Sequence, residues 1–247
     1  AVVIDNTACF RYEDDIPLVV PEVNPEAVKF FSNRNIIANP NCSTIQLVVA
    51  LAPIHKIAKI KRINVATYQS ISGAGRKALD LLNEQTRMAL SGDDPKQEQS
   101  FAFNVIPQID VFQKNDFTKE EMKIVWETQK ILNDYDLLVN ATAVRVPVRV
   151  GHSEAVSIQT EIAISPDQIK EVLSQSQSIE IIDDVNEKLY PTPLIHGDNT
   201  NVVYVGRIRK DHTLKNGMNL WVVADNIRKG AALNGVQIAE VLVKNYL

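Results

Sequence analysis

Cys42 stands where a thiol could act as a nucleophile. It separates a short apolar segment, 35–38, which we expect to be a strand, from a long apolar segment, 43–58, which we expect to be a buried helix. A helix N-terminus offers free backbone N–H groups, which lower the pKa of a thiol and can hold an oxyanion. Position alone does not separate this role from that of a small, inert cysteine at a helix start.

The second cysteine, Cys9, has no such setting. It lies between Ala8 and Phe10 with no helix start beside it, and we expect it to fill the core. Two cysteines are too few for a disulfide framework or a structural zinc site. We therefore expect a cytoplasmic protein with reduced thiols and no metal ligands.

A cysteine nucleophile needs a group that exchanges protons with it, and the chain offers four histidines. His152 is the best candidate, because a glycine and a proline-containing segment before it indicate a bent backbone that suits a side chain aimed into a cleft. His55 lies inside the apolar helix. His196 and His212 lie in polar stretches and could simply be solvated.

The first 41 residues alternate apolar runs with a helical segment, a pattern typical of a parallel sheet with crossover helices. We expect a strand at 1–4, an apolar run at 18–20, a helix at 25–31 with Asn24 as its N-cap, and a strand at 35–38.

From residue 42 onward strands and helices no longer alternate strictly, which indicates a mixed or antiparallel sheet. Capping boxes at 118–121 and 165–168 predict helices that end near 133 and 173. Further helices are expected at 76–90 and 226–246, with a turn at 72–75 and a polar loop at 91–99. The expected strands are 61–69, 137–144, 154–164, 179–183, 202–208 and 220–224.

Composition excludes several classes of function. The net charge is −4 without a basic block, which argues against nucleic acid as a partner. The longest apolar run, 47–54, is too short to cross a membrane.

The chain opens directly on an apolar run, as natural domains seldom do, so we expect that an N-terminal segment has been removed or is not part of this chain.

A series of segments, in order along the chain, carries a family resemblance. They are 5–7 with 10–11, 20–24, Asn-Pro-Asn-Cys-Ser-Thr at 39–44, 68–75, Arg-Val-Pro-Val at 145–148 with Gly-His-Ser-Glu at 151–154, 205–211, and 221–223 through 231–232. Together they resemble the aspartate-β-semialdehyde dehydrogenase family, and most of all its bacterial branch.

This resemblance implies an α/β fold made of two parts with different kinds of sheet. Residues 1–41 would be the remaining part of a Rossmann-type NADP-binding domain. Residues 42–224 would form a glyceraldehyde-3-phosphate-dehydrogenase-like catalytic and dimerisation domain with a mixed, largely antiparallel sheet, and 225–247 a helix that packs back on the cofactor domain. The resemblance also implies a homodimer.

The implied reaction is the NADPH-dependent conversion of L-aspartyl-4-phosphate to L-aspartate 4-semialdehyde and phosphate, which supplies lysine, threonine, methionine and diaminopimelate biosynthesis. By position, Cys42 would form the acyl thioester, His152 would be the acid/base group and Gln69 would position the substrate. Arg145 would bind the α-carboxylate of the substrate and Glu120 its α-ammonium group, in keeping with the charges of these side chains.

The resemblance implies two further sets of residues. Arg11, Asn41 and Lys123 would form the phosphate pocket, and Lys123 shares a helix face with Glu120 because the two are three residues apart. Ser72, Gly73 and Asn226 would contact the nicotinamide cofactor.

The chain departs from the family in one respect and leaves alternatives open. It lacks the Gly-x-x-Gly-x-x-Gly loop that would hold the cofactor pyrophosphate. The chain could therefore be a non-catalytic dimerisation core rather than an active enzyme. An enzyme like N-acetyl-glutamyl-phosphate reductase shares the chemistry, although its acylated substrate amine argues against a partner at Glu120. A cysteine hydrolase is a more distant alternative.

Overall fold

The computed structural model describes residues 1–93 and 100–247. Most strands form a six-stranded sheet in the order β4-β3-β5-β8-β7-β6. In one half of the sheet, β3 (Ile60–Gln69) runs parallel to β4 (Leu138–Arg145) and antiparallel to β5 (His152–Thr160). The other half contains β8 (Gly217–Ala224), antiparallel to β5 and β7 (Val203–Lys210), and β6 (Ile179–Ile181), parallel to β7. The prediction of a mixed sheet is confirmed.

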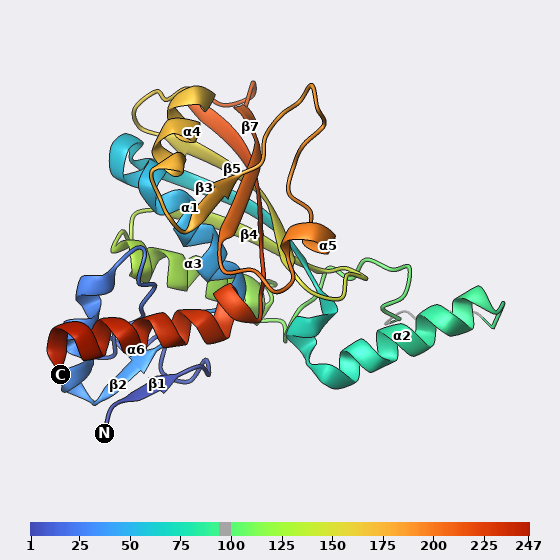
Figure 1. The fold of residues 1–247 in the computed structure, drawn as a ribbon, viewed down its shortest axis with the longest axis horizontal. Helices are drawn as coiled ribbons and strands as arrows, with labels where there is room; N and C mark the ends of the chain where they lie inside the picture. Colours follow the sequence, from blue (N-terminus) through green and yellow to red (C-terminus); the bar gives the residue numbers. More distant parts are fainter. Residues whose placement is uncertain (94–99) are drawn as a thin grey trace.

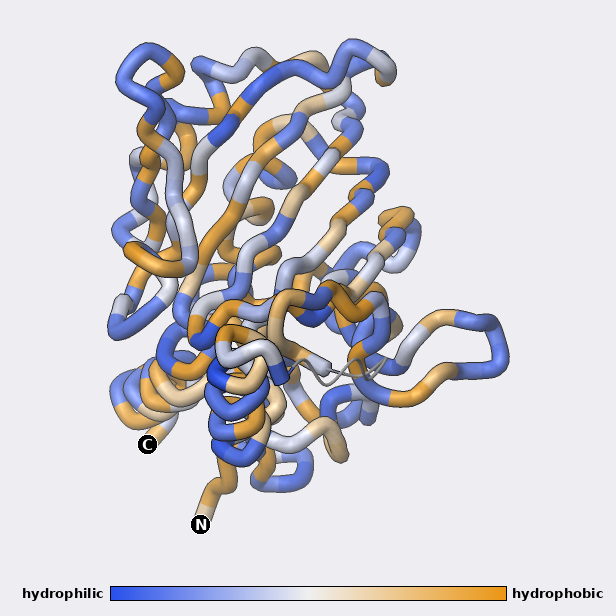
Figure 2. The backbone as a smooth tube through the Cα atoms, turned by 90° about the vertical axis from the view of Figure 1, so that its right-hand side faces the viewer, coloured by the Kyte–Doolittle hydropathy of each residue, from blue (hydrophilic) through white to orange (hydrophobic). Residues whose placement is uncertain are grey.

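Three helices cover one face of this sheet (Figure 1): α1 (Cys42–Ala58), α3 (Lys119–Leu132) and α4 (Pro166–Ser174). The apolar helix α1 is buried along most of its length, as predicted. Both predicted capping boxes are present, at the starts of α3 and α4. Hydrophobic and hydrophilic residues follow one another along the strands (Figure 2), because the helices cover only one face of the sheet.

A smaller unit lies at one end of this body. β1 (Val3–Asp5) and β2 (Ile36–Ala38) pair in parallel, and α6 (Leu233–Tyr246) lies beside them (Figure 1). The 3₁₀ helix η1 (Pro25–Asn33) joins α6 in a hydrophobic cluster separate from the main core. Ile16, Leu18 and Val20, however, belong to the main core, so the division of the chain at residue 41 stays a prediction.

Helix α2 (Arg76–Leu90) has the predicted bounds and extends away from the body (Figure 1). It follows the short 3₁₀ helix η2 (Ile71–Ala74), which takes the place of the predicted turn. Of the polar loop predicted at 91–99, residues 94–99 lie outside the described residues. The four-residue helix α5 (Pro193–His196) lies in a segment for which no helix is predicted.

Several predictions of local structure are wrong. The strand predicted to reach 164 ends at Thr160, because the N–H groups of Glu161 and Ile162 donate to the carbonyl of Ala58. The helix predicted from 226 begins at 233. Before it, the Asp225 carboxylate accepts from the N–H groups of residues 227 and 228, and the π-helical turn η3 (Arg228–Ala232) follows.

Asn24 and Cys9 also differ from prediction. The Asn24 side chain makes no cap hydrogen bond, because it bonds the N–H of Val20 and the carbonyl of Leu18 instead. Cys9 is exposed rather than buried in the core. Its N–H donates to the Thr7 hydroxyl within a segment of bends that joins no strand, so its apolar neighbours do not carry it inward.

Candidate active site

Strand register places three predicted site residues in one row. β3 ends at Gln69, which pairs with Arg145 at the end of β4. β5 begins at His152, next to the residue that pairs with Tyr68. Gln69, Arg145 and His152 are all buried, and the register places them side by side at the same end of these three strands.

Helix α1 begins at this end of the strands, with Cys42 as its first residue. The Asn41 side chain caps the helix, accepting hydrogen bonds from the N–H groups of Ser43 at 3.0 Å and Thr44 at 3.3 Å. The turn η3 packs closely on the other side of the thiol, because a methyl group added at Gly230 would stand 3.0 Å from Cβ of Cys42. Cys42 remains partly accessible.

Helix α3 brings Glu120 to the same place. Glu120 Oε1 accepts hydrogen bonds from Asn41 Nδ2 at 2.9 Å and from Gln69 Nε2 at 3.2 Å. Glu120 Oε2 accepts from Lys123 Nζ at 3.0 Å. This buried carboxylate therefore links residues predicted for catalysis with residues predicted for phosphate binding.

Glu127 lies on the same face of α3 as Glu120, two helical turns further along, and was not predicted as a site residue. It is fully buried, and its carboxylate accepts from the Asn41 N–H at 2.6 Å and from Arg11 at 3.1 Å. It thus holds the residue before Cys42 and orients Arg11. Its spacing of seven residues from Glu120 and four from Lys123 was the available signal, since all three share a helix face.

Asp110 was also missed. Its Oδ2 accepts from Lys123 Nζ at 2.8 Å, opposite the contact of Lys123 with Glu120. It lies in the irregular segment before α3, where no periodicity marks it. Burial lowers the pKa of Lys123, but the neighbouring carboxylates outweigh it and leave that pKa above its usual value.

His152 is held by the loop after β3. Its Nδ1 accepts a hydrogen bond from the Ser70 N–H at 3.1 Å, which places the proton of a neutral ring on Nε2. Nε2 has no hydrogen-bond partner among the residues that the structure describes. Burial, and then the positive charge of Arg145, lower the pKa of His152 to about 3.

The electrostatics keep both members of the predicted catalytic pair neutral. Burial, and then the negative charge of Glu120, raise the pKa of Cys42 to about 12. Hydrogen bonding at Ser43 and the charges of Arg145 and Arg11 act in the opposite direction and are outweighed. The free site therefore holds a neutral thiol and a neutral imidazole.

The residues predicted to contact the cofactor form a polar cluster. Asn226 Oδ1 accepts from the hydroxyls of Ser70 and Ser72, both at 3.1 Å, and from the Gly151 N–H at 2.9 Å. Gly73 lies directly over the row of catalytic candidates, because a methyl group there would stand 3.2 Å from Arg145 and 3.3 Å from His152. The Gly73 backbone is therefore packed closely against these two side chains. Ser72, Gly73 and Asn226 line the same cavity as Cys42 and offer hydroxyl, amide and backbone groups to a ligand there.

Every predicted site residue except His152 lines one cavity of about 550 Å³. His152 lies beneath Gly73, at the wall of this cavity. Within 1–93 and 100–247, no group of three or more histidine, cysteine, aspartate or glutamate side chains could hold a metal ion. No helix in the described part of the chain is long and apolar enough to span a membrane.

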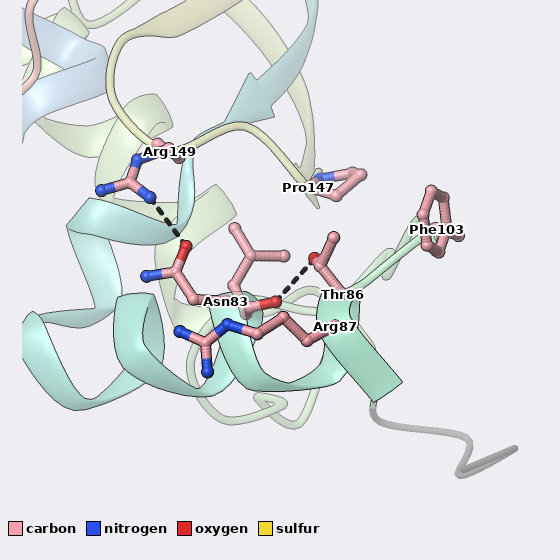
Figure 3. A pocket seen from close by; sticks show the side chains of 7 residues that line it. Asn83, Thr86, Arg87, Phe103, Pro147 and Arg149 are labelled. Atoms are coloured by element: carbon pink, nitrogen blue, oxygen red, sulfur yellow. Dashed lines mark hydrogen bonds between the residues drawn. The ribbon is translucent and has the colours of Figure 1, made fainter. Parts of the chain in front are cut away.

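A second cavity, of about 590 Å³, lies between α2 and the loop that leads to β5 (Figure 3). There Arg149 donates to Asn83 Oδ1 at 2.7 Å, and the side chains of Arg87 and Phe103 complete the wall. It contains none of the predicted site residues, and we assign it no role.

Two protein families match the chain. The family described as "Semialdehyde dehydrogenase, dimerisation domain" matches residues 51–229, and "Semialdehyde dehydrogenase, NAD binding domain" matches residues 1–30. These matches define the class as the semialdehyde dehydrogenases, which are oxidoreductases.

Individual relatives narrow the class further. The aspartate-semialdehyde dehydrogenase of Shewanella sp. (strain DB6705) is 57% identical over 99% of this chain and 73% of its own length. The crystal structure of aspartate semialdehyde dehydrogenase II complexed with ASA from Vibrio cholerae has a TM-score of 0.96 at 55% identity, covering 100% of this chain and 73% of that one. The Candida albicans enzyme with NADP has a TM-score of 0.75 at 28% identity, covering 98% and 70%. The chain belongs to the aspartate-semialdehyde dehydrogenase family, as the sequence resemblance implied.

Proposed function

We propose that this chain carries the catalytic apparatus that converts L-aspartyl-4-phosphate to L-aspartate 4-semialdehyde through an acyl thioester on Cys42. The observation that supports this most directly is the convergence on one cavity of a thiol at a helix N-terminus, Gln69, Arg145 and the carboxylate of Glu120. His152 lies in the same row of strand ends as Gln69 and Arg145. An acidic and a basic side chain flank the thiol, as a zwitterionic amino-acid substrate requires.

Substrate recognition follows from these charges. Arg145 donates one N–H to the Ser70 carbonyl at 2.7 Å, which orients its guanidinium group for the α-carboxylate of the substrate. Glu120 would accept the α-ammonium group. An acylated amine, as in N-acetyl-glutamyl phosphate, carries no charge for Glu120 to pair with, which disfavours that alternative.

Substrate binding would also change the charges that keep Cys42 and His152 neutral. A carboxylate on Arg145 would offset the positive charge that lowers the pKa of His152. An ammonium beside Glu120 would offset the negative charge that raises the pKa of Cys42. Arg145 also acts on the thiol, but Glu120 has the larger effect. The pKa of Cys42 would fall and that of His152 would rise, which favours proton transfer from the thiol to the imidazole. The thiolate would therefore form chiefly when substrate is bound.

Proton transfer from the Cys42 thiol to His152 would require a change of tautomer, because the Ser70 N–H favours a ring that already carries its proton on Nε2. For Nε2 to take the thiol proton, the ring proton would lie on Nδ1, where the Ser70 hydroxyl is 3.1 Å away and can accept it. That hydroxyl in turn donates to Asn226 Oδ1 at 3.1 Å. Ser70 is therefore a positioning residue: its N–H favours the tautomer with the proton on Nε2, and its hydroxyl can accept from the tautomer with the proton on Nδ1.

The covalent step needs no cofactor. The Cys42 thiolate attacks the acyl carbon, a C–S bond forms, and the C–O bond to phosphate breaks, so that phosphate leaves with the electron pair. The oxyanion that forms in between would use the backbone N–H of Cys42 at the start of the helix, because those of Ser43 and Thr44 donate to the Asn41 cap. Arg11, Asn41 and Lys123 line the cavity where the departing phosphate would lie.

The second half of the reaction requires a hydride, which a nicotinamide cofactor supplies when bound. Ser72, Gly73 and Asn226 would hold its nicotinamide end beside Cys42. His152 would donate a proton to, or remove one from, the substrate oxygen, and cleavage of the C–S bond would release the aldehyde and restore the thiol.

A homodimer is part of the same proposal. The family match names a dimerisation domain. On the sheet face opposite the helices, the rings of Tyr68 and Trp221 lie 5.4 Å apart, and Tyr68 is exposed. We propose that this face meets a second copy of the chain. Light scattering should give twice the chain mass for the wild type and a smaller mass for Trp221→Lys.

The test of the chemistry uses the chain itself without cofactor. Mixed with freshly prepared L-aspartyl-4-phosphate, it should gain the mass of one aspartyl group, removable with hydroxylamine. Cys42→Ser should gain none, and Cys9→Ser should behave as wild type. N-acetyl-glutamyl phosphate should label poorly. A wild-type chain that binds the acyl phosphate but never becomes acylated would refute the proposal and favour a non-catalytic dimerisation core. Turnover with NADP, semialdehyde and phosphate then tests the complete cycle.

A further inference from the structure

Asp110 occupies a position that the proposed reaction leaves unexplained. It lines the active-site cavity and lies 2.8 Å from Nζ of Lys123, the lysine proposed to bind phosphate. The Lys123 side chain is only 12% exposed, so its ammonium group has little access to water. A phosphate group that reaches Lys123 must therefore share the lysine with a carboxylate.

The backbone holds Asp110 in this place. Its φ of +69° lies in the left-handed region, which aspartate and asparagine adopt more readily than most residues. Its Oδ1 accepts from the Val111 N–H at 2.9 Å, and the Val111 carbonyl accepts from the Lys119 N–H at 2.8 Å. The neighbouring Ile109 is buried. The loop thus fixes the carboxylate at the start of α3.

The two carboxylates on Lys123 differ in their other contacts. Glu120 also accepts hydrogen bonds from Asn41 and Gln69, which tie it to the floor of the site. Asp110 Oδ2 accepts only from Lys123 among the contacts of the described residues, and its side chain is 31% exposed. Asp110 is therefore the partner of Lys123 that an incoming anion can replace at the lower cost.

We infer that the Asp110 carboxylate is an internal occupant of the phosphate subsite, which holds Lys123 in the empty enzyme and competes with inorganic phosphate for it. This inference rests on the proposed role of Lys123. Asp110 would thereby weaken phosphate binding and favour its departure after thioester formation. Removing its charge while keeping its shape should tighten phosphate binding.

Asp110→Asn provides the test, because asparagine tolerates the left-handed backbone and its oxygen can still accept from the Val111 N–H. The chain is titrated with inorganic phosphate by calorimetry and by phosphorus NMR. We expect at least a threefold lower Kd in the variant. Asp116→Asn, an exposed change in the same loop at a similar φ of +64°, is the matched control and should leave Kd unchanged.

The remaining outcomes separate this inference from the proposed function. In a Lys123→Gln background, Asp110→Asn should bring no gain, because the competition needs the lysine. If phosphate binds and depends on Lys123, but Asp110→Asn leaves Kd unchanged or raises it, the inference is overturned and the proposed function stands. If wild type binds no phosphate, or binds it independently of Lys123, both the phosphate subsite and this inference fail.

Discussion

Replacing Glu120 by glutamine should make the Cys42 thiol of the free enzyme more reactive, although the same change removes the proposed partner of the substrate ammonium group. The pKa of Cys42 is raised from 9.0 to about 12, first by burial and then by the charge of Glu120. Glutamine removes that charge while its amide oxygen can still accept from Asn41 Nδ2 and Gln69 Nε2. Lys123 keeps its contact with Asp110.

The size of the effect follows from the two causes. A thiol pKa of about 12 instead of 9.0 leaves up to about a thousandfold less thiolate at neutral pH, because each pKa unit is a factor of ten. Burial is the larger cause and persists in the variant, so only part of this factor returns. We expect the thiolate fraction to rise about tenfold, equivalent to about 1.4 kcal/mol.

Alkylation by iodoacetamide, followed by intact-mass measurement from pH 7 to 9, reports the thiolate directly. Cys9 is exposed and would also react, so every chain carries Cys9→Ser. Since the pKa stays above this range, both rates should rise about tenfold per pH unit, with the Glu120→Gln rates uniformly higher. Glu84→Gln, on the exposed side of α2, is the control. Equal or slower alkylation of Glu120→Gln would refute the electrostatic account of the resting thiol.

Three further predictions address the framework of the site. Gly230→Ala should slow acylation of Cys42 at least tenfold with little change in substrate affinity, measured by single-turnover mass spectrometry, because the added methyl group would stand 3.0 Å from Cβ of Cys42. Arg11→Gln should lower the free energy of unfolding, measured in urea, by about 3 kcal/mol, because it leaves the fully buried Glu127 carboxylate without its positively charged partner. Arg34→Gln, at an exposed ion pair, should lower it by less than about 1 kcal/mol. Burial raises the folded-state pKa of Glu154 well above 4.5, so its contribution to stability is present below pH 4.5 and is lost as pH rises toward the folded-state pKa. Glu154→Gln should therefore gain stability over wild type by up to about 1.4 kcal/mol per pH unit above 4.5, and a constant difference in urea midpoint from pH 5 to 8 would contradict this.

Local signals predicted the elements well where they act over a few residues. The capping boxes at Thr118 and Ser165 define helix starts because side-chain oxygens satisfy backbone N–H groups three residues on. The bounds of α2 followed from the turn predicted before it, at 72–75, and the polar loop predicted after it, from 91. The strand prediction failed at Thr160 because a distant group, the Ala58 carbonyl, accepts from the N–H groups that follow. The last helix starts later than predicted for a local reason, since the Asp225 carboxylate accepts from the N–H groups of residues 227 and 228.

Cys9 illustrates the limit of composition. Its apolar neighbours suggested burial, yet the segment pairs with no strand and the thiol is exposed. Whether an apolar residue is buried depends on what packs over it, which the flanking residues do not specify.

The sequence alone predicted the chemical groups of the site: a thiol at a helix start, a histidine after a bent segment, and acidic and basic side chains one helical turn apart. These are properties of residue type and short spacing. The fold alone aligned Gln69, Arg145 and His152 in one row, because strand register joins residues far apart in the chain. It also placed Glu127 behind Asn41 and Asp110 on Lys123, and it shifted the pKa values of Cys42 and His152 in opposite directions. Burial and the distance between charges produce those shifts, and both exist only once the chain is packed.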